Sequence, residues 1–210
     1  MPDTAGYLFI GVIAALVTFV STPFVVKLAT RMNWVVAPDE RRVHKVPTPD
    51  VGGIAMFLGF IVALGIAWKM GRFSPVFDNN SEPLGVLLAA ILIFATGLID
   101  DIREISSPAK VTGTVIAGLV LVYFGATMFY FRVPFLGVIQ LGNDWIPIVT
   151  VVWLLGMVQA INLIDGLDGL AAGIVAIGST AFFIYSRHLS GLGLLSEPNI
   201  GPLIAIITVG

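Results

Sequence analysis

The feature that most constrains this chain is a series of apolar runs that reach or approach the length needed to cross a lipid bilayer. A hydrocarbon core of about 30 Å takes about 20 helical residues. A lipid-exposed strand edge would leave backbone groups unpaired, so each run is predicted to be an α-helix. The shorter runs are expected to extend into flanking glycine or polar residues. The runs lie at Tyr7 to Ala29, Ile54 to Trp68, Leu84 to Leu98, Val111 to Tyr130, Ile146 to Ile161 and Leu170 to Tyr185.

Composition agrees with a membrane location. Hydrophobic residues make up 57% of the chain and charged residues 11%, with a mean hydropathy of +0.98. This leaves too little polar surface to enclose a water-soluble fold. The absence of cysteine excludes disulfides and thiolate metal sites, and the net charge of −2 gives no indication of nucleic-acid binding. The prediction is an all-α polytopic membrane protein with one transmembrane domain over residues 1–210.

Basic residues near the helix ends predict the orientation, because cytoplasmic loops carry an excess of Lys and Arg. With the N-terminus outside, the first, third and fifth loops are cytoplasmic. These loops receive most of the basic residues: Lys27, Arg31, Arg41, Arg42, Lys45, Arg103 and Lys110, against Lys69, Arg72, Arg132 and Arg187 on the other side.

Two further segments are interpreted from their pattern. Phe129 to Trp145 is partly alternating and contains Pro134, Gly137 and Gly142, which predicts a short external hairpin. Ile200 to Gly210 begins another apolar run, but about 11 helical residues cover only about half of a hydrocarbon core. We therefore expect six transmembrane helices plus the start of a seventh, in a chain truncated at its C-terminal side.

The polar stretch from Asn162 to Gly173 places an amide and two carboxylates, Asp165 and Asp168, at three-residue steps after an apolar run. An ionised aspartate at bilayer depth costs about 2.5 to 3.5 kcal/mol, so these groups are expected at a membrane face, paired or liganded. In a continuous helix Asn162, Asp165 and Asp168 would share one face, opposite Leu163, Leu167 and Leu170. The alternative is that one aspartate is an N-cap, a role that needs a single residue.

A second polar motif closes the third run, where Asp100 and Asp101 are followed by Arg103 and Lys110. Adjacent carboxylates repel each other unless a cation or basic group neutralises them. The arrangement suits a metal site or a base that acts on phosphate. The alternative is a solvated helix end that faces lipid headgroups.

The first loop, from Asp39 to Gly53, contains several basic residues together with His44 and Lys45. Arg and Lys side chains hydrogen-bond phosphate oxygens, so the loop suits a pyrophosphate. The alternative is that these basic residues only set topology and meet anionic lipids.

Together these motifs resemble the polyprenyl-phosphate N-acetylhexosamine-1-phosphate transferases. The resemblance is carried by Asn162-Leu-Ile-Asp-Gly-Leu-Asp-Gly-Leu-Ala, by Gly97-Leu-Ile-Asp-Asp with a following Ile-Ser-x-Pro-x-Lys, and by Arg-x-His-x-x-Pro-x-Pro-x-x-Gly-Gly in the first loop. The chain looks most like the bacterial undecaprenyl-phosphate N-acetylglucosamine-1-phosphate transferases of glycosyltransferase family 4 type. The phospho-N-acetylmuramoyl-pentapeptide transferases are the nearest rival. Asp50 stands where the first group usually has a basic residue, and the family's Gly-Asp-x-Gly-Ser-like element is not in this sequence.

The resemblance implies the reaction and its components. Undecaprenyl phosphate attacks a UDP-N-acetylhexosamine, giving a lipid diphosphate-linked sugar and UMP, at the cytoplasmic face of the bacterial inner membrane. The cofactor is Mg²⁺, with Mn²⁺ as the alternative. The implied roles are Asn162 as a metal ligand, Asp100 and Asp101 as catalytic residues beside the lipid phosphate, and Asp165, Asp168, His44, Lys45 and Lys110 as substrate-binding residues.

Other interpretations stay open at this point. Intramembrane carboxylates and glycine-interrupted helices also mark ion-coupled transporters. The chain could also act as an inactive assembling partner. The sequence leaves open which sugar is transferred, which glycopolymer is made (lipopolysaccharide or teichoic acid, for example), and whether two copies form a homodimer.

Overall fold

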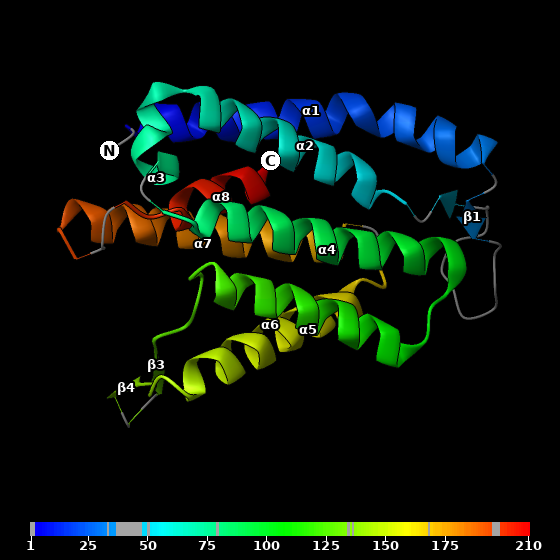
Figure 1. The fold of residues 1–210 in the computed structure, drawn as a ribbon. Helices are drawn as coiled ribbons and strands as arrows, with labels where there is room; N and C mark the ends of the chain where they lie inside the picture. The colour runs from blue at the N-terminus through cyan, green and yellow to red at the C-terminus, as the bar shows by residue number, and fades with distance from the viewer. Residues whose placement is uncertain are drawn as a thin grey trace. The chain divides into compact units, whose positions relative to one another are not determined.

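The computed structural model describes residues 3–32, 34–36, 48–49, 51–78, 80–133, 135, 137–167, 169–194 and 198–210. Its residues form two compact units (Figure 1). Unit 1 comprises Met1–Asn80 and Asp165–Gly210, and unit 2 comprises Ser81–Ile164.

Unit 1 is built on two long helices, α1 (Thr4–Arg31) and α2 (Gly53–Lys69), which lie side by side. They approach closely because Gly59 has no side chain where a Cβ would meet Thr18 and, at 2.9 Å, the Ala14 carbonyl oxygen. The α1 helix begins at Asp3, whose carboxylate accepts the Gly6 N–H at 3.0 Å as an N-cap.

The remaining elements of unit 1 pack on this pair or extend it. After α2 the chain bends by 85° into the 3₁₀ turn η1 (Gly71–Phe73) and the short helix α3 (Ser74–Asp78). A two-residue antiparallel pair, β1 (Val35–Val36) with β2 (Thr48–Pro49), was not expected from the sequence. The helix α7 (Leu170–Gly191) and the nine-residue α8 (Gly201–Val209) complete the unit, and α8 packs against α7, α1 and α2. The core between α1 and α8 includes the fully buried Ile10 and Leu203.

Unit 2 contains three helices, α4 (Glu82–Arg103), α5 (Ser107–Tyr123) and α6 (Trp145–Ile164). Glycines allow close packing here too, because a Cβ on Gly118 would lie 3.0 Å from Val151. At one end the Ser81 hydroxyl donates to the Phe124 carbonyl oxygen at 3.0 Å, which joins the start of α4 to the end of α5. At the same end the Met128 N–H donates to the Thr150 hydroxyl of α6 at 3.0 Å. Neighbouring helices in this unit are therefore antiparallel.

The chain between α5 and α6 forms a hairpin of β3 (Tyr130–Val133) and β4 (Gly137–Gln140). The register pairs Tyr130 with Gln140 and Val133 with Gly137. This confirms the hairpin predicted within Phe129 to Trp145. It also shows that extending the fourth apolar run to Tyr130 was wrong. The helix α5 ends at Tyr123 because the chain turns at Gly125, which has a φ of +90° that glycine adopts without strain.

The prediction of a helical membrane protein is confirmed. Among the residues that the structure describes, α1, α4, α6 and α7 are each long and apolar enough to cross a membrane, and α2 with its bent continuation is a fifth candidate. The 17-residue α5 is apolar but shorter. As expected, the shorter apolar runs extend at their ends: α4 continues to Arg103, α6 to Ile164 and α7 to Gly191.

Candidate functional site

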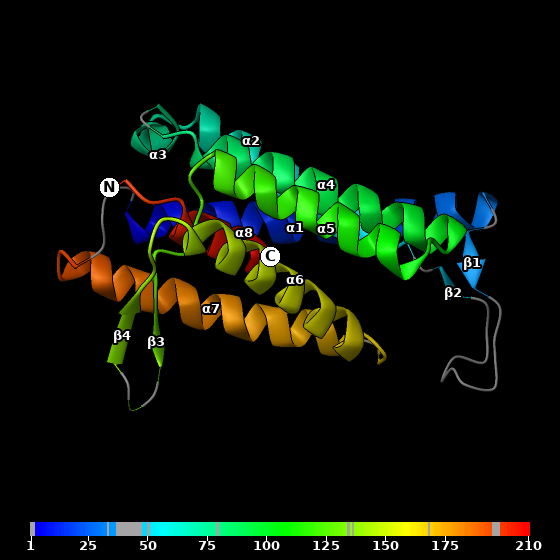
Figure 2. The same cartoon turned by 60° about the horizontal axis from the view of Figure 1, so that its bottom comes forward.

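One end of unit 2 gathers several of the polar residues singled out in the sequence. Asp100 and Asp101 lie in the last turn of α4, Lys110 in the first turns of α5, and Asn162 in the last turn of α6. Because these helices are antiparallel to their neighbours, the end of α4, the start of α5 and the end of α6 share one end of the unit (Figure 2). The polar end is therefore built by tertiary packing from three separate segments.

Asp100 is held by two contacts that close the α4–α5 turn. Its Oδ2 lies 2.6 Å from the Lys110 Nζ, and its Oδ1 accepts the Ile105 N–H at 3.2 Å. The turn itself passes through Glu104, which has a left-handed φ of 47° at the C-cap of α4. The Asp100 and Lys110 side chains are 23% and 33% exposed, so the pair is largely screened from water. Lys110 was predicted as a phosphate partner, which remains a prediction, and in the structure it forms an ion pair with Asp100.

Asp101 and Asn162 are exposed at the same end of unit 2. A helical residue is rotated by about 100° from the one before it, so Asp101 presents its carboxylate in a different direction from Asp100. Asn162 offers an amide oxygen, which is neutral at any pH. The two adjacent aspartates therefore differ in exposure: Asp100 is partly buried, whereas Asp101 is exposed.

A shared helical face from Asn162 through Asp168 would need a continuous helix, and the structure does not form one here. The helix α6 ends at Ile164, Asp165 and Gly166 form a turn, and α7 begins only at Leu170. Gly169 occupies the N-cap position of α7 with a φ of +74° and supplies no side-chain cap. The Asp-Gly pairs favour turns over helix, which is the physical reason for the break. Neither Asn162 nor Asp165 is the N-cap of α7.

Asp165 belongs to unit 1, where it is exposed and precedes α7. His44, Lys45 and Asp168 lie outside the described residues. Within the described ranges, no group of three or more His, Cys, Asp or Glu residues could hold a metal ion.

A feature that the sequence analysis missed is an apolar groove along α6. It has a volume of about 350 Å³ and is lined by Trp145, Ile148, Val149, Val152, Trp153, Gly156 and Met157. The signal in the sequence was a repeat of large apolar residues at helical spacing beside one glycine. Met157 and Asn162 are five residues apart, so the groove ends about 7.5 Å along the helix axis from the polar end.

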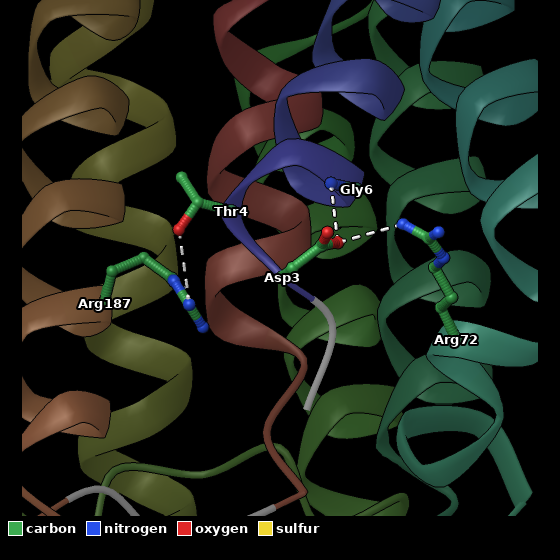
Figure 3. A network of polar contacts seen from close by, with 5 residues as sticks. All are labelled: Asp3, Thr4, Gly6, Arg72 and Arg187. Atoms are coloured by element: carbon green, nitrogen blue, oxygen red, sulfur yellow. Dashed lines mark hydrogen bonds and ion pairs between the residues drawn. The ribbon is translucent and has the colours of Figure 1, made fainter.

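A second polar cluster occupies the end of unit 1 where α1 begins and α7 ends (Figure 3). Asp3 forms an ion pair with Arg72 at 3.1 Å, and the Arg187 Nη2 donates to the Thr4 hydroxyl at 3.4 Å. The Arg187 guanidinium also lies 5.2 Å from the centre of the Tyr7 ring. These contacts hold the two helix ends together, and none involves a predicted site residue.

Comparison with known proteins defines the class and then the family. Several helices are long and apolar enough to cross a membrane, and polar residues lie at their ends. The fold is that of a multi-pass membrane protein. The model of "Glycosyl transferase family 4" matches residues 83–209, which is more than half of the chain. The chain therefore belongs to glycosyl transferase family 4.

Three relatives are similar to this chain over most of its length. A decaprenyl-phosphate N-acetylglucosaminephosphotransferase of Mycobacterium leprae is 37% identical over 86% of this chain and 46% of its own length. A probable undecaprenyl-phosphate N-acetylglucosaminyl 1-phosphate transferase of Bacillus subtilis is 32% identical over 86% of this chain and 48% of its own. A phospho-N-acetylmuramoyl-pentapeptide-transferase of Streptomyces avermitilis is 32% identical over 79% of this chain and 52% of its own length. The chain thus spans about half the length of the curated relatives it matches. No solved structure matches.

Proposed function

We propose that this protein transfers N-acetylglucosamine 1-phosphate, or a related N-acetylhexosamine 1-phosphate, from a UDP-sugar to undecaprenyl phosphate. The products are a lipid diphosphate-linked sugar and UMP, and the reaction begins the synthesis of a cell-envelope glycopolymer. Membership of glycosyl transferase family 4 supports this proposal. So do the printed names of the relatives in M. leprae and B. subtilis, which pair a polyprenyl phosphate with N-acetylglucosamine. The alternative, a muramoyl-pentapeptide substrate, is supported by a relative that matches a smaller share of this chain than the other two relatives do.

The observation that carries the proposal is the composition of α6 and its neighbours. The helix has an apolar groove over most of its length and an oxygen donor, Asn162, in its last turn. The Asp100–Lys110 pair and Asp101 lie at that same end of unit 2. A substrate with a long apolar chain and a phosphate head requires this combination. We therefore assign the groove to the prenyl chain and the polar end to the phosphate.

The reaction needs positioning and charge neutralisation more than covalent help from the protein. An oxygen of the lipid phosphate attacks the β-phosphorus of the UDP-sugar, and the bond to the departing UMP breaks. A phosphate monoester has a second pKa of about 6 and is largely dianionic at neutral pH, so it needs little assistance from a base. We assign to Asp101 the orientation of the attacking phosphate. We assign to Asp100 the positioning of Lys110, whose positive charge then faces the phosphates from a fixed place.

A divalent cation, Mg²⁺ in the first instance, fits the donor chemistry at the end of α6. Asn162 offers an amide oxygen, oxygen atoms are the ligands that Mg²⁺ prefers, and the residue is exposed. Asn162 would hold the cation together with substrate phosphates, and Asp165 is proposed to bind the nucleotide and diphosphate. When bound, the cation would neutralise charge on the diphosphate. Asp168, His44 and Lys45 are proposed to bind the nucleotide and diphosphate, as their motifs imply.

We further propose a topology with six transmembrane helices, the start of a seventh in α8, and the N-terminus outside the bacterial inner membrane. The Asp100, Lys110 and Asn162 end of unit 2 is then cytoplasmic, where nucleotide sugars are made available. Within unit 1, Arg72 and Arg187 lie at the same end as Asp3, as this topology requires.

The proposal is tested by replacing Asp101 with Asn and measuring UMP release from UDP-N-acetylglucosamine in membranes that hold the wild-type or variant protein. We expect turnover to fall about 100-fold, a loss typical of a reacting group that is no longer held in the right orientation. Glu104→Gln is the matched control, because it removes a nearby carboxylate from the same turn and should retain most of the activity. Wild-type turnover in Asp101→Asn would contradict the role of Asp101. Proton-driven uptake of a solute without UMP release would instead favour a transporter.

A further inference from the structure

The β3–β4 hairpin presents an apolar surface that the rest of the described chain leaves uncovered. Val138 is 62% exposed, Tyr130 is 65% exposed, and Phe135 between the strands is fully exposed. Arg132 is the one charged residue in the sequence between Gly125 and Asn143. An isolated two-stranded hairpin is marginal in water, and an exposed apolar patch usually marks an interaction surface. This hairpin therefore needs a partner that accepts apolar side chains.

The hairpin is fixed at the end of unit 2 opposite the Asp100–Lys110 pair. The Leu141 N–H donates to the Phe129 carbonyl oxygen at 2.9 Å and closes its base. The Met128 N–H donates to Thr150 at 3.0 Å and ties the preceding segment to α6. Figure 2 shows the strands running crosswise to α4 and α5 of this unit and not along them. For helices that cross a bilayer, such a hairpin lies along the membrane surface.

The aromatic residues of unit 2 concentrate at this same end. Tyr123 at the end of α5 is 85% exposed, Phe129 is 58% exposed and Trp145 at the start of α6 is 61% exposed. The segments that build the opposite, carboxylate end, residues 95–110 and 157–164, contain no aromatic residue. Tyr and Trp are enriched where a membrane protein meets the headgroup region, because one part of each side chain is apolar and the other polar.

We propose that the β3–β4 hairpin is an interfacial anchor that lies in the headgroup and upper acyl region of the leaflet opposite the carboxylate end. Its partner is lipid, because the two membrane helices that the hairpin joins, α5 and α6, also expose large apolar side chains, such as Leu119 and Ile148. The anchor holds the end of α5 and the start of α6 at a constant depth. The polar end of the same two helices is thereby kept at the opposite membrane surface. This inference does not depend on the transferase reaction.

The absence of cysteine allows a direct test by single labels. Val138→Cys and Tyr130→Cys are each labelled with the fluorophore NBD and reconstituted in nanodiscs of phosphatidylcholine and phosphatidylglycerol, at one chain per disc. Asn143→Cys is the control, because this exposed polar residue lies beside the hairpin. Quenching is measured with aqueous iodide and with lipids that carry a doxyl group near the headgroup. Both faces of a nanodisc are open to water, so iodide reaches either side.

We expect the labels at Val138 and Tyr130 to be quenched strongly by the shallow doxyl lipid and several-fold less by iodide than the label at Asn143. Iodide quenching equal to that of the Asn143 label would overturn the proposal, because the hairpin would then stand in water. Weak quenching by both agents would overturn it as well, since protein would cover the strands. Shielding that appears only when a disc holds two chains would assign the surface to a second copy.

Discussion

Single side chains at the α4–α5 turn differ in their surroundings although they are neighbours in the sequence. Asp100 makes an ion pair and accepts a backbone N–H, both within the turn. Asp101 is exposed at the same place. A motif of two adjacent carboxylates therefore contains one residue that organises the backbone and one that faces outward. The proposed roles follow from this difference, with Asp100 as a positioning residue and Asp101 as the residue beside the phosphate.

The Asp100–Lys110 pair is tested by a double-mutant cycle of Asp100→Asn, Lys110→Met and the double variant. Each single change leaves a partly buried partner uncompensated, so each should lower the stability, and we expect a coupling energy of about 0.5 to 3 kcal/mol between the two sites. Thermal unfolding in detergent gives the stability, and UMP release gives the activity. If the effects of the two single changes simply add in the double variant, the pair does not organise the turn.

The helix α6 combines two properties that belong to an element and not to any one residue. The groove is formed by several apolar side chains at helical spacing together with Gly156. The exposed amide of Asn162 lies at the end of the helix because α6 stops at Ile164. The Asp165-Gly166 turn provides that end. This combination suits the proposed substrate, whose lipid chain and phosphate head would lie along one axis.

Gly156→Leu tests the assignment of the groove to the prenyl chain. Nothing lies within 4 Å of a Cβ built on Gly156, so the first carbon of a larger side chain meets no neighbour and the side chain occupies part of the groove that Gly156 lines. We expect the KM for the polyprenyl phosphate to rise about tenfold, equivalent to about 1.4 kcal/mol, with the KM for the UDP-sugar unchanged. Gly178→Leu in α7 is the control, because its surroundings are equally open and it is not in the groove. Equal changes in both KM values would remove the basis for the assignment.

Within each unit, the two ends of the helices carry different side chains. In unit 2 the aromatic hairpin and the carboxylate-bearing end lie at opposite ends of the helices. In unit 1 the Asp3, Arg72 and Arg187 cluster lies where α1 begins and α7 ends, whereas Asp165 precedes the other end of α7. This separation is what a membrane protein with chemistry at one surface requires.

The proposed orientation predicts which positions are open to each side of the membrane. Asn143 and Ser106 are exposed and lie at opposite ends of unit 2, so each is replaced singly by cysteine. In intact spheroplasts, a membrane-impermeant maleimide should label Asn143→Cys at once and Ser106→Cys only after permeabilisation. The cysteine-free chain is the blank. The reverse pattern would place the N-terminus inside and the proposed site outside, away from nucleotide sugars.

Much of the fold was predictable from the sequence, and less of the candidate site. The apolar runs located the long helices, and the Pro and Gly residues located the hairpin. The end of α5 was placed too late because residues after Tyr123 stay apolar although they leave the helix. The sequence separated the runs Ile146 to Ile161 and Leu170 to Tyr185, and the break after Ile164 agrees with this, but the helical spacing of the polar residues between the runs did not show that Asp165 and Gly166 form a turn. Hydropathy does not distinguish these cases, since it records burial in lipid and not backbone conformation.

The amino-acid sequence is sufficient to identify a helical membrane protein and the residue types at its helix ends, because transfer of side chains into lipid depends on composition summed along a local segment. The three-dimensional structure was needed to show that Lys110 forms an ion pair with Asp100, and that this pair and Asn162 share one end of unit 2. It alone also showed that the apolar side chains of α6 form a groove. The reason is that such contacts depend on how a turn closes and how closely glycines let helices approach. Local hydropathy does not predict the distances between residues that are far apart in the sequence.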